Sequence, residues 1–403
     1  MDVNSIKKDF PMFDKHPELS YLDTTATSLK PRVVIDKMNE YYFNYGVNIH
    51  RGVYKLSYDA TEAYENARKV VAKFINAEEK EIVFLKNTTE ALNHACLMYS
   101  KFLSSGDEII TTELEHHSSL LPWQNVSKEK NLNLSFIPLN KDGRITVESF
   151  KNTITDKSRV VVITYISNVM GYISPLEEII KIAHDHNMIV IVDAAQAVGH
   201  EIVDVKKLDC DFLAFSGHKM MGPMGIGVLF GKQKLLKKMD PVFYGGDMNE
   251  DVGKYYVEVK DIPYRFEAGT PMIAEVIGLS EAIKYIQSIG YKYIKNYEDE
   301  IKDYLFKSLS KIDGISVYNP GSDIPLVTFN INGVHPHDAA TLFDERGICI
   351  RAGYHCAQLV SKWLGCNGSL RASFYIYNTK DDVDRFVETI KDSVEFFSQF
   401  NEV

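Results

Sequence analysis

The sequence lacks an apolar run of the roughly 18 residues that a bilayer-spanning helix requires. Its first residues, MDVNSIKKDFPMFDKHPEL, mix both signs of charge and contain no apolar signal core. Basic residues are in the minority, because 45 lysines and arginines face 55 aspartates and glutamates for a net charge of −10, and they are scattered. We therefore expect a cytoplasmic protein that binds neither membranes nor nucleic acids, with small molecules or proteins as partners.

Cysteine is rare as well, with five residues among 403 and no CxxC pair. This spacing does not resemble a disulfide framework or a zinc site, and we expect no bound metal. Cys96, Cys210 and Cys349 lie in apolar segments and are predicted to be small buried side chains. Cys366 has no motif around it, and without a motif Cys356 would also be interpreted as structural.

The chain contains no internal repeat, no low-complexity segment and no linker rich in proline, glycine or serine. From about residue 80 to 230, apolar runs of strand length alternate with helical patterns, which predicts an α/β fold whose mainly parallel central sheet is flanked by helices. After about Pro263 the pattern changes to that of a smaller α+β domain. We place the large domain at residues 20–264 and the smaller domain at residues 1–19 plus 265–403.

One strand–helix–strand unit is especially clear. Arg159–Ile166 is predicted as a buried strand, and Met188–Val192 as the next strand, which Asp193 ends. Between them, the run Ser174-Pro175-Leu176-Glu177 offers an N-cap, a proline at the first helical position and a capping glutamate, which predicts a helix to about His186.

Other segments follow the same plan. Glu81–Leu85 precedes the helix-start sequence NTTE, and Phe212–Phe215 precedes the sequence SGHK. The predicted elements of the smaller domain are a strand at Leu326–Ile331, a helix ending near Gly347, strands around Ile348–Arg351 and Leu370–Tyr377, and a final helix capped by Thr379.

Polar residues gather where these strands end. In open parallel sheets ligands bind outside the carboxyl ends of the strands, so Thr88, Asp193, Ser216, His218 and Lys219 are expected to line one cavity. Asp193 either caps a local turn or meets a cation, because an unpaired buried carboxylate is costly. Taken singly, Lys219 would be a solvated lysine and the other three would be capping or turn residues.

The motifs DAAQA (Asp193–Ala197) and SGHKMMGPMGIG (Ser216–Gly227) resemble those of fold-type I pyridoxal-phosphate enzymes, specifically the class V aminotransferase branch. The resemblance implies that fold and covers nearly the whole chain. Within the branch, the sequence around Cys356 is most similar to Suf-type cysteine desulfurases. The other motifs that carry the resemblance are YLDTTATS (Tyr21–Ser28), HRG (His50–Gly52), NTTEALN (Asn87–Asn93), ELEHH (Glu113–His117), SNVMG (Ser167–Gly171), FEAGTP (Phe266–Pro271), RAGYHCA (Arg351–Ala357) and RASFYIYNT (Arg371–Thr379).

The resemblance implies that Lys219 holds pyridoxal phosphate as a Schiff base and moves protons during the reaction. Asp193 would keep the ring nitrogen protonated, and Gln196 would bind the phenolic oxygen. His116, rather than His117, would stack on the ring and take part in proton transfer. A metal site at this histidine pair is not expected, since adjacent side chains diverge and no third ligand is near in sequence.

The cofactor's phosphate would be held by Thr88, Ser216 and His218, at a helix start and in the lysine loop. The resemblance adds Gly269 and Thr270 from a neighbouring subunit, which implies a homodimer.

The implied substrate is L-cysteine. Arg371 would bind its α-carboxylate, Asn168 would lie near both cofactor and substrate, and His50 belongs to the same substrate site. Cys356 would attack the substrate's sulfur and keep it as a persulfide, leaving L-alanine. Arg351 and His355 would favour the thiolate.

The resemblance further implies a SUF-type sulfur-acceptor protein and a role in iron–sulfur cluster assembly. His335 and His337 resemble a region that engages such an acceptor in some relatives, although they could simply begin a helix at Asp338. One departure from the family pattern, at Thr24–Ala26, adds hydroxyl and methyl groups near the cofactor. Selenocysteine lyase activity or another class V β-elimination is the alternative, and a non-catalytic relative would have lost the key residues.

Overall fold

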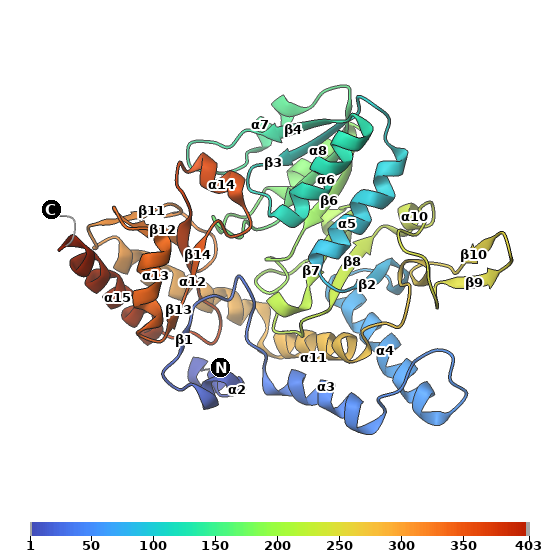
Figure 1. Cartoon of the computed structure of the whole chain (residues 1–403), viewed down its shortest axis with the longest axis horizontal. Helices are drawn as coiled ribbons and strands as arrows, with labels where there is room; N and C mark the ends of the chain where they lie inside the picture. The colour runs from blue at the N-terminus through green and yellow to red at the C-terminus, as the bar shows by residue number, and fades with distance from the viewer. Residues whose placement is uncertain (1, 400–403) are drawn as a thin grey trace.

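The computed structural model describes residues 2–399 and is built around a seven-stranded sheet (Figure 1). Only β8 runs antiparallel to its neighbours, so the predicted mainly parallel sheet is confirmed. In spatial order the strands are β2 (Ile82–Leu85), β8 (Gly227–Gly231), β7 (Phe212–Ser216), β6 (Ile189–Asp193), β5 (Ser158–Thr164), β3 (Glu108–Thr112) and β4 (Asn133–Ile137).

Helices cover both faces of this sheet because side chains along its strands alternate between two apolar clusters. Val160 and Val162 of β5 join the cluster that contains side chains of α5 and α6, while Val161 and Ile163 join the cluster with α4, α8 and α11. The helices are α3 (Arg32–Asn44), α4 (Lys55–Phe74), α5 (Thr88–Tyr99), α6 (His117–Lys130), α7 (Val147–Thr153), α8 (Leu176–Asp185), α9 (Val205–Leu208), α10 (Gln233–Leu236) and α11 (Ile273–Ile289).

A second, four-stranded antiparallel sheet forms the C-terminal part, together with a third apolar cluster. Its strand order is β11 (Ile315–Val317), β12 (Leu326–Ile331), β15 (Ser369–Ser373) and β14 (Arg351–Gly353). Its helices are α12 (Tyr291–Leu309), α13 (Pro336–Asp344), α14 (Gln358–Trp363) and α15 (Lys380–Ser398). This smaller α+β part agrees with the expected fold class.

The N-terminal segment lies against this C-terminal part. The short strand β1 (Ser20–Tyr21) pairs in parallel with β13 (Ile348–Cys349), and the rings of Phe10 and Phe13 contact Tyr377. Two short helices precede β1, namely α1 (Val3–Lys7) and α2 (Pro11–Lys15). The domain limits at residues 20 and 264 stay a prediction.

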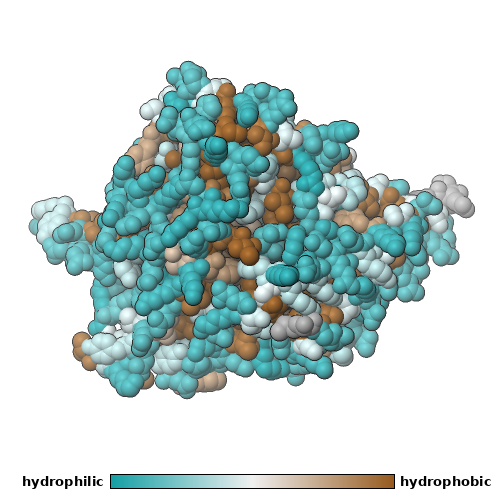
Figure 2. Space-filling model, turned by 180° about the vertical axis from the view of Figure 1, so that it is seen from behind, coloured by the Kyte–Doolittle hydropathy of each residue, from teal (hydrophilic) through white to brown (hydrophobic). Residues whose placement is uncertain are grey.

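A hairpin of β9 (Asn249–Val252) and β10 (Val257–Val259) projects from the body, at the right of Figure 1 and the left of Figure 2. Tyr255 at its tip is 89% exposed. In the described part of the chain, four 3-10 turns complete the elements: η1 (Glu79–Glu81), η2 (Ser100–Phe102), η3 (Gly217–Lys219) and η4 (Tyr264–Phe266). Among the residues described, no helix is both long enough and apolar enough to cross a bilayer.

Most predicted element boundaries are accurate to a few residues, but the predicted cap at Ser174 is wrong. Helix α8 begins at Leu176, Pro175 occupies the cap position, and no side chain caps the helix. The Ser174 hydroxyl is buried and donates instead to the Thr164 carbonyl at 2.6 Å. The last predicted strand is also shorter, since β15 ends at Ser373.

Candidate active site

A cavity of about 200 Å³ opens at the carboxyl ends of β5, β6 and β7. Nine residues that the sequence marked as site candidates line it: Thr88, His116, Asn168, Asp193, Gln196, Ser216, His218, Lys219 and Arg371. The fold therefore brings together residues that lie up to 283 positions apart in the chain, from Thr88 to Arg371 (371 − 88).

Lys219 ends the η3 turn that follows β7 and lines the cavity. Burial lowers the pKa of its amine to about 8, although the carboxylate of Asp193 opposes that shift. An amine with this pKa is largely free of its proton at mildly alkaline pH, which is the form that attacks a carbonyl carbon.

Asp193 ends β6, as predicted, and is almost fully buried. Its Oδ1 accepts a hydrogen bond of 3.0 Å from the Ala195 amide, so it does cap a local turn. Burial raises the pKa of this carboxyl, whereas the Ala195 amide and Lys219 lower it. Asp193 is expected either to cap a turn or to meet a cation, and it does both, since its carboxylate also interacts with the Lys219 amine.

His116 is the N-cap of α6, and its Nδ1 accepts a hydrogen bond from the Ser118 amide at 3.1 Å. Burial and the nearby charge of Lys219 lower the pKa of His116 to about 3, so its ring is neutral. His117 does not line this cavity. Its Nε2 accepts from the Gln358 amide, and its own amide donates to the Cys356 carbonyl at 2.8 Å.

Anion-binding groups lie where β7 ends and α5 begins. The Ser216 hydroxyl contacts both the amide and the hydroxyl of Thr88, at 2.7 and 2.6 Å, and Asn87 caps α5. A helix N-terminus with hydroxyl groups suits a phosphate. Gly227 makes this approach possible, because a Cβ there would lie 2.4 Å from the Asn87 backbone. Burial, with the charge of Lys219, lowers the pKa of His218 to about 4.

Arg371 lies on β15 with its guanidinium fully buried. It donates to Asp23 Oδ1 at 3.1 Å and to the Asn168 carbonyl at 3.0 Å, while its Nε has no hydrogen-bond partner among residues 2–399. Burial lowers the pKa of Arg371 to about 10, although Asp23 opposes the shift. The unpartnered Nε is consistent with a site that is completed by an acidic ligand group.

Cys356 is exposed on the loop after β14, and its Sγ lies 3.8 Å from a guanidinium nitrogen of Arg351, which lines the cavity. His355 is also expected to favour the thiolate, but it does not do so as a cation. Burial and the two neighbouring arginines lower the pKa of His355 to about 2, so it is neutral. Both His355 and Cys356 have positive φ angles, 52° and 55°, which non-glycine residues rarely adopt.

The structure adds two acidic residues whose importance the sequence did not reveal. Asp23 orients Arg371 and lies two residues after the end of β1. Glu115 is fully enclosed and accepts from the Thr164 amide and the hydroxyls of Thr112 and Ser119, and burial raises its pKa to about 8. In the motif ELEHH nothing distinguishes Glu115 from Glu113.

Comparison with known proteins agrees with this geometry. The family model described as Aminotransferase class-V matches residues 20–386. The chain belongs to the class V aminotransferase family. It is 48% identical over 98% of both chains to a Staphylococcus aureus (strain N315) protein named "Probable cysteine desulfurase". A Staphylococcus epidermidis (strain ATCC 12228 / FDA PCI 1200) protein, also named "Probable cysteine desulfurase", is 47% identical, again over 98% of both chains.

Two solved structures of cysteine desulfurases resemble the whole fold. The apo enzyme from Thermococcus onnurineus NA1 superposes with a TM-score of 0.94 at 42% identity, covering 97% of this chain and 98% of the other. The Escherichia coli cysteine desulfurase CsdA, in an S-sulfonic acid form, gives 0.92 at 37% identity, covering 98% and 99%.

Within this class V aminotransferase fold, the departure at Thr24–Ala26 is accommodated by the C-terminal part. The Thr24 hydroxyl pairs with the Tyr377 hydroxyl at 2.6 Å and does not line the cavity. Thr25 and Ala26 do line it, and the Thr25 carbonyl accepts from Gln196 Nε2 at 2.9 Å. The extra hydroxyl of Thr24 therefore joins two parts of the fold.

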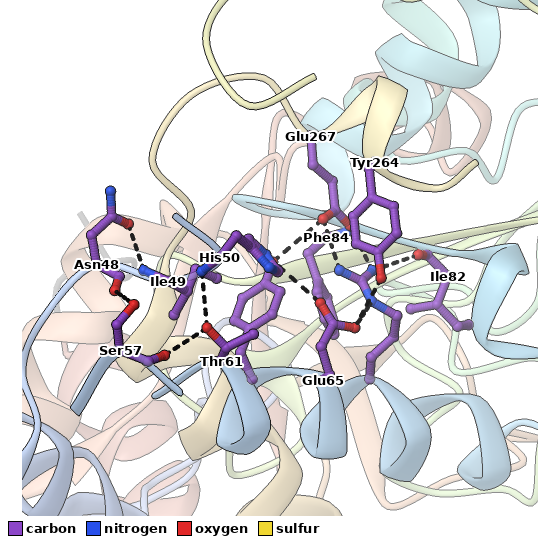
Figure 3. Close-up of polar contacts among 12 residues, drawn as sticks. Asn48, Ile49, His50, Ser57, Thr61, Glu65, Ile82, Phe84, Tyr264 and Glu267 are labelled. Carbon is purple, nitrogen blue, oxygen red and sulfur yellow. Dashed lines mark hydrogen bonds and ion pairs between the residues drawn. The ribbon is translucent and has the colours of Figure 1, made fainter. Parts of the chain in front are cut away.

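Three predicted site residues lie elsewhere in the single chain. His50 and Gly269 line a separate cavity of about 240 Å³, and Thr270 lines another. In Figure 3 the His50 ring points toward Glu65, with 3.7 Å between His50 Nε2 and Glu65 Oε1. Their roles in a neighbouring subunit's site stay predictions, as do the individual roles of the nine cavity residues.

Proposed function

We propose that this chain is a pyridoxal-phosphate-dependent cysteine desulfurase that converts L-cysteine to L-alanine and holds the sulfur as a persulfide on Cys356. The observation that carries the proposal is the pairing of a lysine-centred cavity with an exposed cysteine. Arg351 lines that cavity and contacts Cys356 Sγ. The 48% identity over nearly all of the chain to a protein named as a cysteine desulfurase supports it.

The donor set of the cavity fits the cofactor. The α5 N-terminus, Thr88, Ser216 and His218 suit its phosphate, Asp193 suits a protonated ring nitrogen, and Lys219 supplies the amine that binds its aldehyde carbon. When bound, pyridoxal phosphate withdraws electrons from the α-carbon of an amino acid. Gln196 would bind the ring's phenolic oxygen, and neutral His116 would stack on the ring.

The chain's own residues carry the remaining steps. Arg371, oriented by Asp23 and Asn168, binds the substrate's carboxylate. Lys219, with its lowered pKa, moves a proton at the α-carbon. The guanidinium of Arg351 contacts Cys356 Sγ. The Cys356 thiolate attacks the substrate's sulfur and forms a new S–S bond, while the electron pair of the broken C–S bond stays on the β-carbon, which takes up a proton as L-alanine forms.

The neighbouring subunit and the sulfur acceptor are further parts of the proposal. Gly269, Thr270 and His50 lie away from the cavity of their own chain, which suits a homodimer in which they serve the partner's site. Exposed Phe43 and Val53, 84% and 88% accessible, supply apolar surface near His50 in sequence. We place the protein in the cytoplasm.

A SUF-type acceptor for iron–sulfur cluster assembly would take the persulfide sulfur. His335 caps α13 through the His337 amide, which accounts for His335 as a helix start. Both rings are exposed and stacked, with 5.5 Å between their centroids. His337 also lies close to the strand before Cys356, because a Cβ atom added to Gly353 in that strand would be 4.0 Å from His337 Nε2. If acceptor proteins raise turnover no further than a simple thiol reductant does, the acceptor proposal fails.

The decisive experiment is incubation of the purified, cofactor-loaded protein with L-cysteine, with alanine and the persulfide measured by mass spectrometry. We expect alanine to form and the extra sulfur to map to Cys356. Cys356→Ser should lose the persulfide, whereas Cys366→Ser, which alters a partly buried cysteine, should keep it. A persulfide on another cysteine, or no alanine, would refute the proposal. Selenocysteine as a parallel substrate tests the lyase alternative.

A further inference from the structure

The turn that carries Lys219 is held from outside by residues 27–30, which sequence reasoning left without a role. The backbone carbonyl of His218, one residue before Lys219, accepts from the Ser28 amide at 2.9 Å and from the Ser28 hydroxyl at 3.0 Å. The Thr27 hydroxyl at 3.0 Å and Lys30 Nζ at 3.3 Å also reach this carbonyl. Four donors therefore converge on one backbone oxygen.

The same serine also holds the other side of Lys219. The Met221 amide, two residues after Lys219, donates to the Ser28 hydroxyl at 2.6 Å. A single hydroxyl therefore donates to the His218 carbonyl and accepts from the Met221 amide. Because Ser28 is 1% exposed, water does not compete for either bond.

Met221 needs this support, since its φ angle of 63° is in the left-handed region that side chains with a Cβ rarely adopt. Such a residue persists only where the surrounding structure holds it. Within the turn itself, Met220 and Gly222 both donate to the Gly217 carbonyl. The Met221 amide depends on Ser28, which lies almost 200 positions away along the chain.

Lys30 adds a further donor to the His218 carbonyl, but its burial costs stability. Among the residues described, it has no carboxylate within ion-pairing distance, and its ammonium donates to three neutral oxygens, those of Thr27 Oγ1 and of the Ser28 and His218 carbonyls. Burial lowers its pKa to about 8. A partly buried cation without an acidic partner is destabilising, so Lys30 holds the His218 carbonyl at a cost in stability.

We propose that residues 27–30 form a clamp that positions Lys219, and that the Ser28 hydroxyl is its central positioning residue. The inference deepens the proposed function, on which it rests, because it concerns the same lysine. Ser28 does not line the cavity, so it would act on the reaction only through Lys219. Its effect is on the direction from which the Lys219 amine meets the reacting carbon, and a displacement of about 1 Å at such a group can cost up to a hundredfold in rate.

Ser28→Ala tests the clamp, with Ser28→Thr as the variant that keeps a hydroxyl and Ser393→Ala as the matched control. Ser393 is also 1% exposed, its hydroxyl donates to a backbone carbonyl within α15, and it does not line the cavity. Hydrogen exchange of the purified proteins is followed by mass spectrometry on peptides that cover 217–222. Lys30→Met, which keeps the apolar stem, serves as a second variant should Ser28→Ala unfold.

In Ser28→Ala, the Met221 amide should exchange roughly five- to tenfold faster, the effect of one lost hydrogen bond. The kcat for alanine formation should fall about tenfold or more with KM within about twofold, because Arg371 is untouched. Ser28→Thr should recover most of both, and Ser393→Ala should change neither. Unchanged exchange at Met221, or a Thr variant as impaired as Ala, overturns the clamp. If the unsubstituted protein makes no alanine, the proposed function fails, whereas the exchange measurement still decides the clamp.

Discussion

Lys219 and Asp193 show how burial prepares single residues for chemistry. Both side chains are buried where strands of one sheet end, and the loss of hydration favours the neutral form of each. Their mutual attraction opposes that loss and keeps part of their charge. The lysine therefore loses its proton at a pH well below that of a solvated amine.

This environment predicts a pH dependence for the Lys219 amine in the cofactor-free protein. Its reaction rate with an acylating reagent, followed by peptide mass spectrometry, should rise with pH and reach its midpoint near pH 8. Since Asp193 raises the pKa of Lys219, Asp193→Asn should move the midpoint to lower pH. A midpoint that stays at the same pH in this variant would contradict the coupling between the two residues.

At the scale of elements, one buried ion pair joins α4, β2 and the segment after η4. Arg68 is 1% exposed and bonds both carboxylate oxygens of Glu267, at 2.7 and 2.8 Å, and the Ile82 carbonyl at 2.8 Å. Glu267 also accepts from the Phe84 amide at 2.7 Å (Figure 3). Because Gly269 and Thr270 come two and three residues after Glu267, this pair fixes where that loop leaves the core.

Breaking this pair should be costly. Glu267→Gln removes the bidentate counter-charge of the buried Arg68 cation and leaves Arg68 with the 3.1 Å contact from its Nε to Glu65 Oε2. The free energy of unfolding, measured by urea denaturation, should therefore fall by about 3 kcal/mol, the low end of the range for a broken buried pair. Lys207→Gln is the control, because Lys207 and its partner Glu177 are 70% and 61% exposed. That exposed pair should contribute less than about 1 kcal/mol. Equal losses in both variants would show that burial does not set the strength of the pair.

Local signals in the sequence predicted elements where the deciding interaction is itself local. Asn87 and Thr379 each accept from an amide three residues on, as their helix-start patterns predicted. Ser174 had the same pattern but its hydroxyl bonds a strand carbonyl, because the tertiary fold places that carbonyl beside it. A capping pattern therefore predicts a helix start reliably only where no buried partner competes for the hydroxyl.

At the scale of the whole molecule, the proposed site is divided between two chains. Subunit mixing tests this division with Lys219→Ala and Thr270→Glu, the latter placing a negative charge where a partner's phosphate would lie. Each variant alone should be nearly inactive. A mixed dimer contains one site with both residues intact and should recover roughly half of the wild-type rate, measured as alanine release from separately tagged, co-purified chains.

As the control, each variant homodimer is carried through the same subunit-mixing procedure by itself. A fully active Thr270→Glu homodimer would contradict the shared site, as would a mixed dimer no more active than its parents. Sedimentation should show dimers in every sample, because neither substitution removes the exposed apolar side chains near His50.

The sequence by itself determined the sheet, its strand ends and the family, because strand periodicity, helix caps and ordered motifs depend on neighbouring residues. Only the tertiary structure decided that Ser28 holds both sides of Lys219, that Asp23 orients Arg371, and that His355 is neutral. These properties arise from contacts between distant segments and from loss of hydration, and neither is encoded in the spacing of residues along the chain.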